Sequence, residues 1–225
     1  VTAYAVGRSD HLTALTFHYG QTHGKEVGCA ARVASVLGVD HKLLDVAFLK
    51  EVAWYSALTN PEAFDVPKDA SAIGTDIPIT YVPLRNTMFL SLSAALLESK
   101  VLYAIEVEGV PASEIVARLY MAPNAIDYSG YPDCRPEFYG QMATTLCLGS
   151  KLGAEYGIDI EIETPIIHLS KAEIVQMAVE LDAPLDLTWS CYESGETPCN
   201  ECDSCVLRAK GFAEAGVMDP LITHG

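Results

Sequence analysis

The chain has 225 residues, half of them hydrophobic, which suffices for one large domain or for one domain with a small appendage. Its formal net charge of −16 argues against broad binding of nucleic acid, which requires a basic surface, but allows a local basic pocket for small anions. No run of about twenty apolar residues indicates a membrane span. Because four of the seven cysteines cluster near the C-terminus, we expect metal binding rather than disulfides, a reducing compartment and a cytoplasmic location.

The first half of the chain predicts a βαβ unit. Residues 1–7 read as a helix that begins without a capping residue. An apolar run rich in β-formers at residues 12–19 predicts a buried strand, and residues 25–37 have helical spacing up to Gly38. Residues 41–46 predict a second strand. This order favours a parallel sheet with helices on its faces.

The middle of the chain is less regular. Residues 57–80 are expected to form a long loop over the active edge. Asn86 is predicted to cap a helix over 87–97, which would place Arg85 at its positive end. Residues 101–110 predict a strand, and residues 112–121 a strand or a short helix.

The second half ends in two helices. Residues 124–135 predict an ordered loop, 136–153 a helix and 158–164 a strand. Ser170 and Glu173 have the spacing of a capping box at the start of a helix over 171–181. A last helix is expected over 202–215, directly after the cysteine cluster.

The cysteine cluster reads CYESGETPCNECDSC, with Cys191, Cys199, Cys202 and Cys205 at C-x7-C-x2-C-x2-C spacing. Four thiolates from one loop predict a closed, structural Zn²⁺ site. An iron–sulfur cluster is the first alternative, although the close fourth cysteine followed by Pro is absent. Unliganded or redox-active cysteines are the second. A closed zinc site does no chemistry, so the function must lie elsewhere.

Polar segments after strands are the candidates, because parallel sheets bind ligands at the carboxyl ends of their strands. Three of them are patterned: YVPLRN (81–86), AIDYSGYPDCR (125–135) and LSKAEI (169–174). Together with FHYGQTHGKE (17–26) and the four cysteines, they make the chain resemble the 7-cyano-7-deazaguanine synthase family of the PP-loop ATP pyrophosphatase superfamily. The resemblance runs through nearly the whole chain.

The resemblance implies a Rossmann-like parallel α/β sheet of the adenine nucleotide alpha hydrolase type, with a small zinc-binding helical segment at the C-terminus. We expect a nucleotide-binding α/β domain over 1–185 and the zinc-binding segment over 186–225. The family converts 7-carboxy-7-deazaguanine, ammonia and ATP into a nitrile through an activated carboxylate and an amide, so ATP with Mg²⁺ is implied.

The sequence departs from the family pattern at two places. The SGGxDS-type phosphate loop after the first strand is absent, and the opening Val1-Thr2-Ala3 resembles the residues that should follow it. We expect the first strand and this loop to exist in the natural protein. Residues 101–123 are also longer than the single strand expected before DYSGYPDCR.

Two basic residues are the candidate catalytic groups. Lys171 lies in the first turn of a helix after a strand, where its charge suits a phosphate; the alternative is a solvated lysine. Arg85 is a bidentate donor for phosphate or carboxylate, against the alternative of a surface ion pair. Asn86 beside it is a cofactor-binding candidate but fits a helix cap better.

The loop at 127–135 is the candidate substrate pocket, unless it is merely structural. A deazaguanine presents N–H donors that suit carboxylates, its own carboxylate suits an Arg, and aromatic rings could stack on it. The candidate residues are Asp127, Tyr128, Tyr131, Asp133 and Arg135. Cys134 beside Arg135 permits a nucleophile, which the family chemistry does not need. His18, Gln21 and His23 could line the ATP or ammonia site but are not assigned a catalytic role.

Three functions are therefore weighed: the nitrile-forming ligase, another PP-loop enzyme that thiolates or amidates tRNA, and a non-catalytic nucleotide- or zinc-binding module. The net charge of −16 disfavours a tRNA substrate. We expect small-molecule substrates, no direct contact with nucleic acid, no membrane, and a homodimer, the last from the resemblance alone.

Overall fold

The computed structural model describes residues 1–20, 24–66, 77–124, 131–193 and 195–222. Within these residues the chain is a mixed α/β structure whose strands pair in parallel, as β1 with β2 and as β3 with β4. The predicted α/β class with parallel strands is confirmed. In the described residues no ladder joins the two pairs.

The first half forms the predicted βαβ unit, but the strand predicted to be buried is only partly buried in the described structure. Helix α1 (Thr2–Val6) precedes strand β1 (Thr13–His18), helix α2 (Lys25–Val36) and strand β2 (Asp40–Asp45). The register pairs Thr13 with Asp40 and His18 with Asp45. A short helix, α3 (Leu49–Val52), follows. From there to the start of α4 the described residues contain no further helix or strand, as expected for the predicted loop.

The second half corrects two predictions. Helix α4 runs over Arg85–Glu106 and residues 107–110 form no strand, so the strand predicted over 101–110 is wrong. A short apolar run does not distinguish strand from buried helix, and Val101 packs in the same core as Leu90 and Ala94 earlier on α4. Strand β3 (Ala117–Tyr120) follows, within the 112–121 stretch read as strand or short helix, and β4 (Ile160–Glu163) matches its prediction.

Asn86 does not cap α4. The helix begins at Arg85, two residues before the predicted start, and follows Leu84, which has a positive φ of 55°. The N–H of Asn86 instead donates to Oδ2 of Asp133 at 3.2 Å. A carboxylate distant in sequence thus satisfies one of the open N–H groups of the first turn, which a local sequence pattern cannot reveal.

The helix predicted over 136–153 is also shorter. Helix α5 (Pro136–Gly149) stops at Ser150, and a π-helical turn (Leu152–Tyr156) follows. A Cβ on Gly153 would lie 2.1 Å from the carbonyl oxygen of Cys147, so this close turn requires glycine.

The C-terminal helices are as predicted. Ser170 and Glu173 form the capping box of α6 (Lys171–Glu180), and α7 (Asp203–Ala215) follows the cysteine loop, with Cys202 as its N-cap residue. Gly211 lies against Lys171, and a Cβ there would come within 2.6 Å of Lys171 Cβ. This glycine lets α6 and α7 approach closely.

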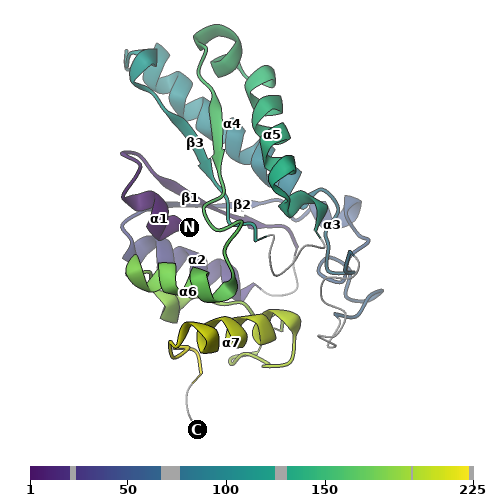
Figure 1. Cartoon of the computed structure of the whole chain (residues 1–225). Helices are drawn as coiled ribbons and strands as arrows, with labels where there is room; N and C mark the ends of the chain where they lie inside the picture. Colours follow the sequence, from purple (N-terminus) through teal and green to yellow (C-terminus); the bar gives the residue numbers. More distant parts are fainter. Residues whose placement is uncertain (21–23, 67–76, 125–130, 194, 223–225) are drawn as a thin grey trace.

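Figure 1 shows how these elements are arranged. Strands β3 and β4 lie with α4 and α5 in one half, around a core that includes Leu90, Leu152 and Ile160. Strands β1 and β2 lie with α1 and α2, and α6 and α7 extend toward the C-terminus. Stacking of Phe17 on Phe89, with ring centroids 4.1 Å apart, joins β1 to α4.

Among the described residues, α4 alone is long and apolar enough to cross a membrane by length and composition. Its Leu90, Ala94 and Val101 are buried in the core shared with β3 and α5. A helix that packs within a protein core passes the same test, so the composition of α4 does not assign it to a membrane.

Candidate functional site

The four clustered cysteines converge as predicted. The sulfur atoms of Cys191, Cys199, Cys202 and Cys205 all lie within 4.8 Å of one another, and the four thiols are not joined in disulfides. Tetrahedral zinc with Zn–S bonds of about 2.3 Å places its sulfurs about 3.8 Å apart, so this arrangement fits such an ion. The cluster is therefore a candidate metal centre with four thiolate ligands.

Backbone N–H groups lower the pKa of Cys199 in this cluster, whereas burial raises the pKa of Cys202 and of Cys205. Glu193 and Cys199 donate to Sγ of Cys191 at 3.3 and 3.4 Å. Burial opposes ionisation of Cys199, but N–H groups of Cys202 and Glu201 outweigh it and lower the Cys199 pKa to about 7. Deprotonated sulfur is the form that ligates a metal.

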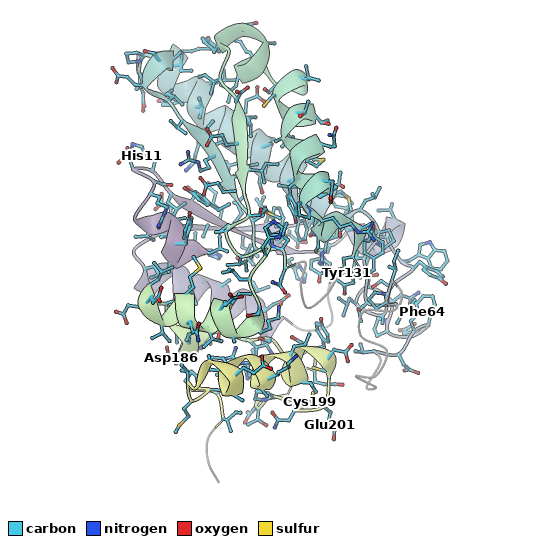
Figure 2. The ribbon with its side chains drawn as sticks, viewed as in Figure 1. His11, Phe64, Tyr131, Asp186, Cys199 and Glu201 are labelled. Carbon is cyan, nitrogen blue, oxygen red and sulfur yellow. The ribbon has the colours of Figure 1, made fainter. Side chains whose placement is uncertain are left out.

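Lys25, the first residue of α2, contacts the cysteine loop and Trp189 just before it. Lys25 Nζ lies 3.6 Å from the ring centroid of Trp189 and donates to the carbonyls of Gly195 and Glu196. Trp189 in turn donates through Nε1 to the carbonyl of Cys191 at 3.1 Å. Figure 2 shows Cys199 and Glu201 beside α7, at the end of the molecule away from α4.

Tyr192 connects this loop to the core beneath β1. It packs both against the cysteines and against the apolar cluster that contains Tyr19, Leu49 and Val82. The metal centre and the β1–α2 half are therefore in direct contact.

Arg85, the first residue of α4, lies beside several polar groups. Its guanidinium carbon is 5.8 Å from the ring centroid of Tyr19. Burial acts to lower the Arg85 pKa, but Tyr19, Tyr131 and Asp133 outweigh it and raise the pKa. The residue remains a fixed positive charge inside the structure.

Asp133 and Asn86 hold each other in place. Besides the contact from Asn86 N, the Asn86 amide donates through Nδ2 to the Asp133 carbonyl at 3.0 Å. Both residues are buried. Burial raises the Asp133 pKa, against the opposing effects of the Asn86 N–H and Arg85.

Cys134 is poorly suited to act as a nucleophile. Burial and the neighbouring Asp133 raise its pKa to about 11, so the thiol stays protonated at neutral pH. Asn86 Nδ2 lies 3.6 Å from its sulfur. The geometry agrees with the reading that the chemistry does not use this residue.

The other described pocket residues are placed differently. Tyr131 is half-buried, and its hydroxyl lies 2.8 Å from Oγ1 of the buried Thr80. Its ring lies 5.7 Å from that of Tyr81. Arg135 is exposed and precedes α5. The structure therefore brings together Arg85, Asn86, Tyr131 and Asp133 and leaves Arg135 at the surface.

Lys171 is held at the start of α6. Its Nζ donates to Oδ1 of Asn124 at 3.1 Å, while Asn124 Nδ2 donates to the carbonyl of Leu169 at 2.6 Å. Asn124, the first residue of the loop predicted over 124–135, thus contacts the candidate phosphate ligand Lys171. The charges of Arg85 and Lys171 both act to lower the Cys134 pKa, against the larger effect of burial.

Four of the candidate residues lie outside the described residues: Gln21, His23, Asp127 and Tyr128. His18 is described, at the end of β1 and partly exposed, with Nδ1 3.4 Å from Oδ1 of Asp45.

Sequence reasoning missed Thr80, Asn124 and Tyr139, all of which contact or influence the candidate residues. They are common residue types without a motif, and only the fold brings them to this place. A cavity of about 280 Å³ lies elsewhere, between β1, α2 and the 187–189 segment.

Parallel strands linked by helices, a cluster of basic and acidic side chains where α4, α5 and α6 begin, and a four-cysteine metal centre define an α/β enzyme of the Rossmann-like class. A family model described as queuosine biosynthesis protein QueC matches residues 1–216. The chain belongs to this family.

Similar curated proteins carry one name. A 7-cyano-7-deazaguanine synthase of Thermoplasma acidophilum is 43% identical over 222 residues, covering 98% of this chain and 85% of the relative. Those of Oceanobacillus iheyensis and Pelobacter propionicus are each 42% identical, covering 98% and 100% of this chain and 91% and 92% of the relatives. The predicted family, the assignment as an enzyme and the place in queuosine biosynthesis are confirmed.

Proposed function

We propose that the protein converts 7-carboxy-7-deazaguanine and ammonia to 7-cyano-7-deazaguanine at the expense of ATP. The observation that supports this most strongly is the family match over residues 1–216, which includes every candidate site residue. The named relatives also favour it over a tRNA-modifying enzyme or a non-catalytic module.

The proposed chemistry uses two activations. ATP transfers AMP to the carboxylate with release of pyrophosphate, and ammonia displaces AMP to give the amide. A second ATP adenylates the amide oxygen with release of pyrophosphate and one N–H proton, and loss of AMP and the second N–H proton gives the nitrile. Each step needs positive charge near phosphate and a fixed position for the heterocycle.

Lys171 and Arg85 are the proposed catalytic residues and supply the positive charge. Both are also proposed to bind ATP, together with Asn86. Lys171 is positioned by Asn124, and the charge of Arg85 is favoured by Tyr19 and Asp133. Asn86 orients Asp133 through two hydrogen bonds. The heterocycle would be held by the loop that contains the proposed substrate residues Asp127, Tyr128, Tyr131, Asp133 and Arg135.

The remaining assignments are proposed on more general grounds. Zn²⁺ is proposed as the structural metal because four thiolates suit it, and Mg²⁺ as the partner of ATP. A homodimer, a cytoplasmic location, no direct contact with nucleic acid, and a division between residues 185 and 186 stay predictions.

Substitution of Lys171 tests the proposed role. Lys171→Met should lower kcat/KM for ATP by about 100-fold or more, as when a charge stabilises a transition state. Lys210→Met is the matched control, because Lys210 is an exposed residue of α7 whose ammonium lies 3.9 Å from Oε1 of Glu214. Equal activity of the two variants would contradict the assignment of Lys171.

A further inference from the structure

Two buried polar atoms, in α5 and in the turn before it, have no hydrogen-bond partner in the described structure: Oδ1 of Asp133 and the hydroxyl of Tyr139. Each residue is only 4% exposed. A buried polar atom without a partner costs about 1–3 kcal/mol, so folded proteins rarely keep two of them together without a reason.

One atom lies in the first turns of α5 and the other in the short turn that precedes this helix. Asp133 lies in the short 3-10 turn Pro132–Cys134, and Tyr139 is the fourth residue of α5. The Asn86 N–H occupies Oδ2 of Asp133, so the carboxylate is oriented and only its other oxygen is available.

The charge of Asp133 acts on the buried Tyr139 hydroxyl. Burial raises the Tyr139 pKa, with further contributions from Cys134 and Asp133 and an opposing one from Arg85. The Tyr139 hydroxyl therefore keeps its proton and can donate it in a hydrogen bond. The candidate residues Arg85 and Tyr131 and the neighbouring Cys134 are only half-buried, so this part of the protein remains open to solvent.

We propose that Asp133 and Tyr139 together recognise the lactam edge of the heterocyclic substrate. This inference rests on the proposed function. In a lactam a ring N–H stands next to a carbonyl oxygen, so the edge offers a donor beside an acceptor. Asp133 Oδ1 accepts from the ring N–H, and the Tyr139 hydroxyl donates to the carbonyl oxygen.

This pairing would determine specificity. A 6-amino analogue presents a ring nitrogen acceptor where the lactam has N–H, so it faces the Asp133 carboxylate with a lone pair instead of a donor. A site built to hydrogen-bond its substrate rejects analogues strongly, because its buried polar groups are then left unpaired.

The inference also predicts an unusual effect on stability. Removing a polar atom that has no partner relieves a cost, so Tyr139→Phe should leave the melting temperature of the ligand-free protein unchanged or raise it. The same substitution should weaken substrate binding. A tyrosine whose hydroxyl serves the fold would show the opposite effect on stability.

The test is calorimetric titration of the complete protein with 7-carboxy-7-deazaguanine and with its 6-amino analogue, without ATP, beside melting curves. We expect Tyr139→Phe to bind the lactam about 10- to 100-fold more weakly, at an unchanged or higher melting temperature. Tyr103→Phe, which removes a hydroxyl from an exposed residue of α4, should change neither.

Asp133→Asn sharpens the test. Its amide oxygen can still accept from Asn86 N, while its NH₂ replaces the free acceptor by a donor and should shift preference toward the 6-amino analogue. Wild-type affinity of Tyr139→Phe, or a lower melting temperature of that variant, overturns the inference alone. Failure of the wild-type protein to bind the lactam overturns the proposed function and this inference with it.

Discussion

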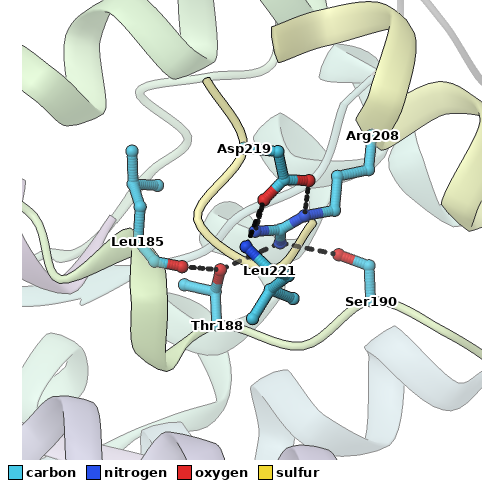
Figure 3. Close-up of polar contacts among 6 residues, drawn as sticks. All are labelled: Leu185, Thr188, Ser190, Arg208, Asp219 and Leu221. Atoms are coloured by element: carbon cyan, nitrogen blue, oxygen red, sulfur yellow. Dashed lines mark hydrogen bonds and ion pairs between the residues drawn. The ribbon is translucent and has the colours of Figure 1, made fainter. Parts of the chain in front are cut away.

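Arg208 and Asp219 form a bidentate ion pair that joins α7 to the segment that follows it. Nε and Nη2 of Arg208 donate to Oδ2 and Oδ1 of Asp219 at 2.7 and 2.8 Å (Figure 3). The side chains are only 12% and 4% exposed. Arg208 also donates to the hydroxyls of Thr188 and Ser190, so it ties α7 both to the segment before the cysteine loop and to the tail.

Breaking this pair should destabilise the protein strongly. Arg208→Met leaves the Asp219 carboxylate buried and unpaired, which typically costs about 3–5 kcal/mol of unfolding free energy. Denaturant unfolding measures the loss. Arg208→Lys keeps the charge without the planar fork and should lose less. A change below about 1 kcal/mol for Arg208→Met would contradict the importance of the pair.

The same pair predicts a dependence on acid. Burial opposes ionisation of Asp219, but Arg208 and the Leu221 N–H outweigh it and lower the Asp219 pKa below 3.8. The stabilisation is therefore complete above about pH 4 and is lost as pH falls through the depressed folded pKa. Melting temperatures of the wild type and Asp219→Asn should converge below that pH. A constant difference down to pH 2 would argue against the pair as its source.

Metal removal should unfold the cysteine loop and change the fluorescence emission of Trp189. Trp189 packs on the cysteine cluster, so chelation or Cys202→Ser should change its emission and lower bound zinc and melting temperature together. A Trp54→Phe background leaves Trp189 as the sole tryptophan of these 225 residues. Metal-free protein with unchanged emission and stability would contradict a structural metal.

Glycine substitutions test the contact between α6 and α7. Gly211→Ala places a Cβ 2.6 Å from Lys171 Cβ, and such overpacking costs about 1–3 kcal/mol, partly offset by about 1 kcal/mol of helix propensity. Gly140→Ala in α5 is the control, because a Cβ there meets nothing within 4 Å and should stabilise by up to about 1 kcal/mol. We expect opposite signs in thermal unfolding. Stabilisation by Gly211→Ala would show that the helices are not closely packed there.

The features that depend on local sequence patterns were predicted correctly. The capping box at Ser170, the βαβ unit and the convergence of four cysteines all follow from spacing and periodicity. The errors arose where distant contacts decide. Asn86 looked like a cap because its neighbours are apolar, but Asp133 performs that role from 47 residues away. The pairing of Lys171 with Asn124 and the burial of Tyr139 likewise depend on how α5 and α6 pack.

The most direct measurement of the central claim uses ¹⁵N-labelled ammonium. The complete protein, incubated with 7-carboxy-7-deazaguanine, ATP and Mg²⁺, should form 7-cyano-7-deazaguanine that is about one mass unit heavier than product made with unlabelled ammonium, and AMP should accumulate with it. Consumption of ATP without a labelled nitrile, or no reaction of the bound acid, would contradict the proposed activity.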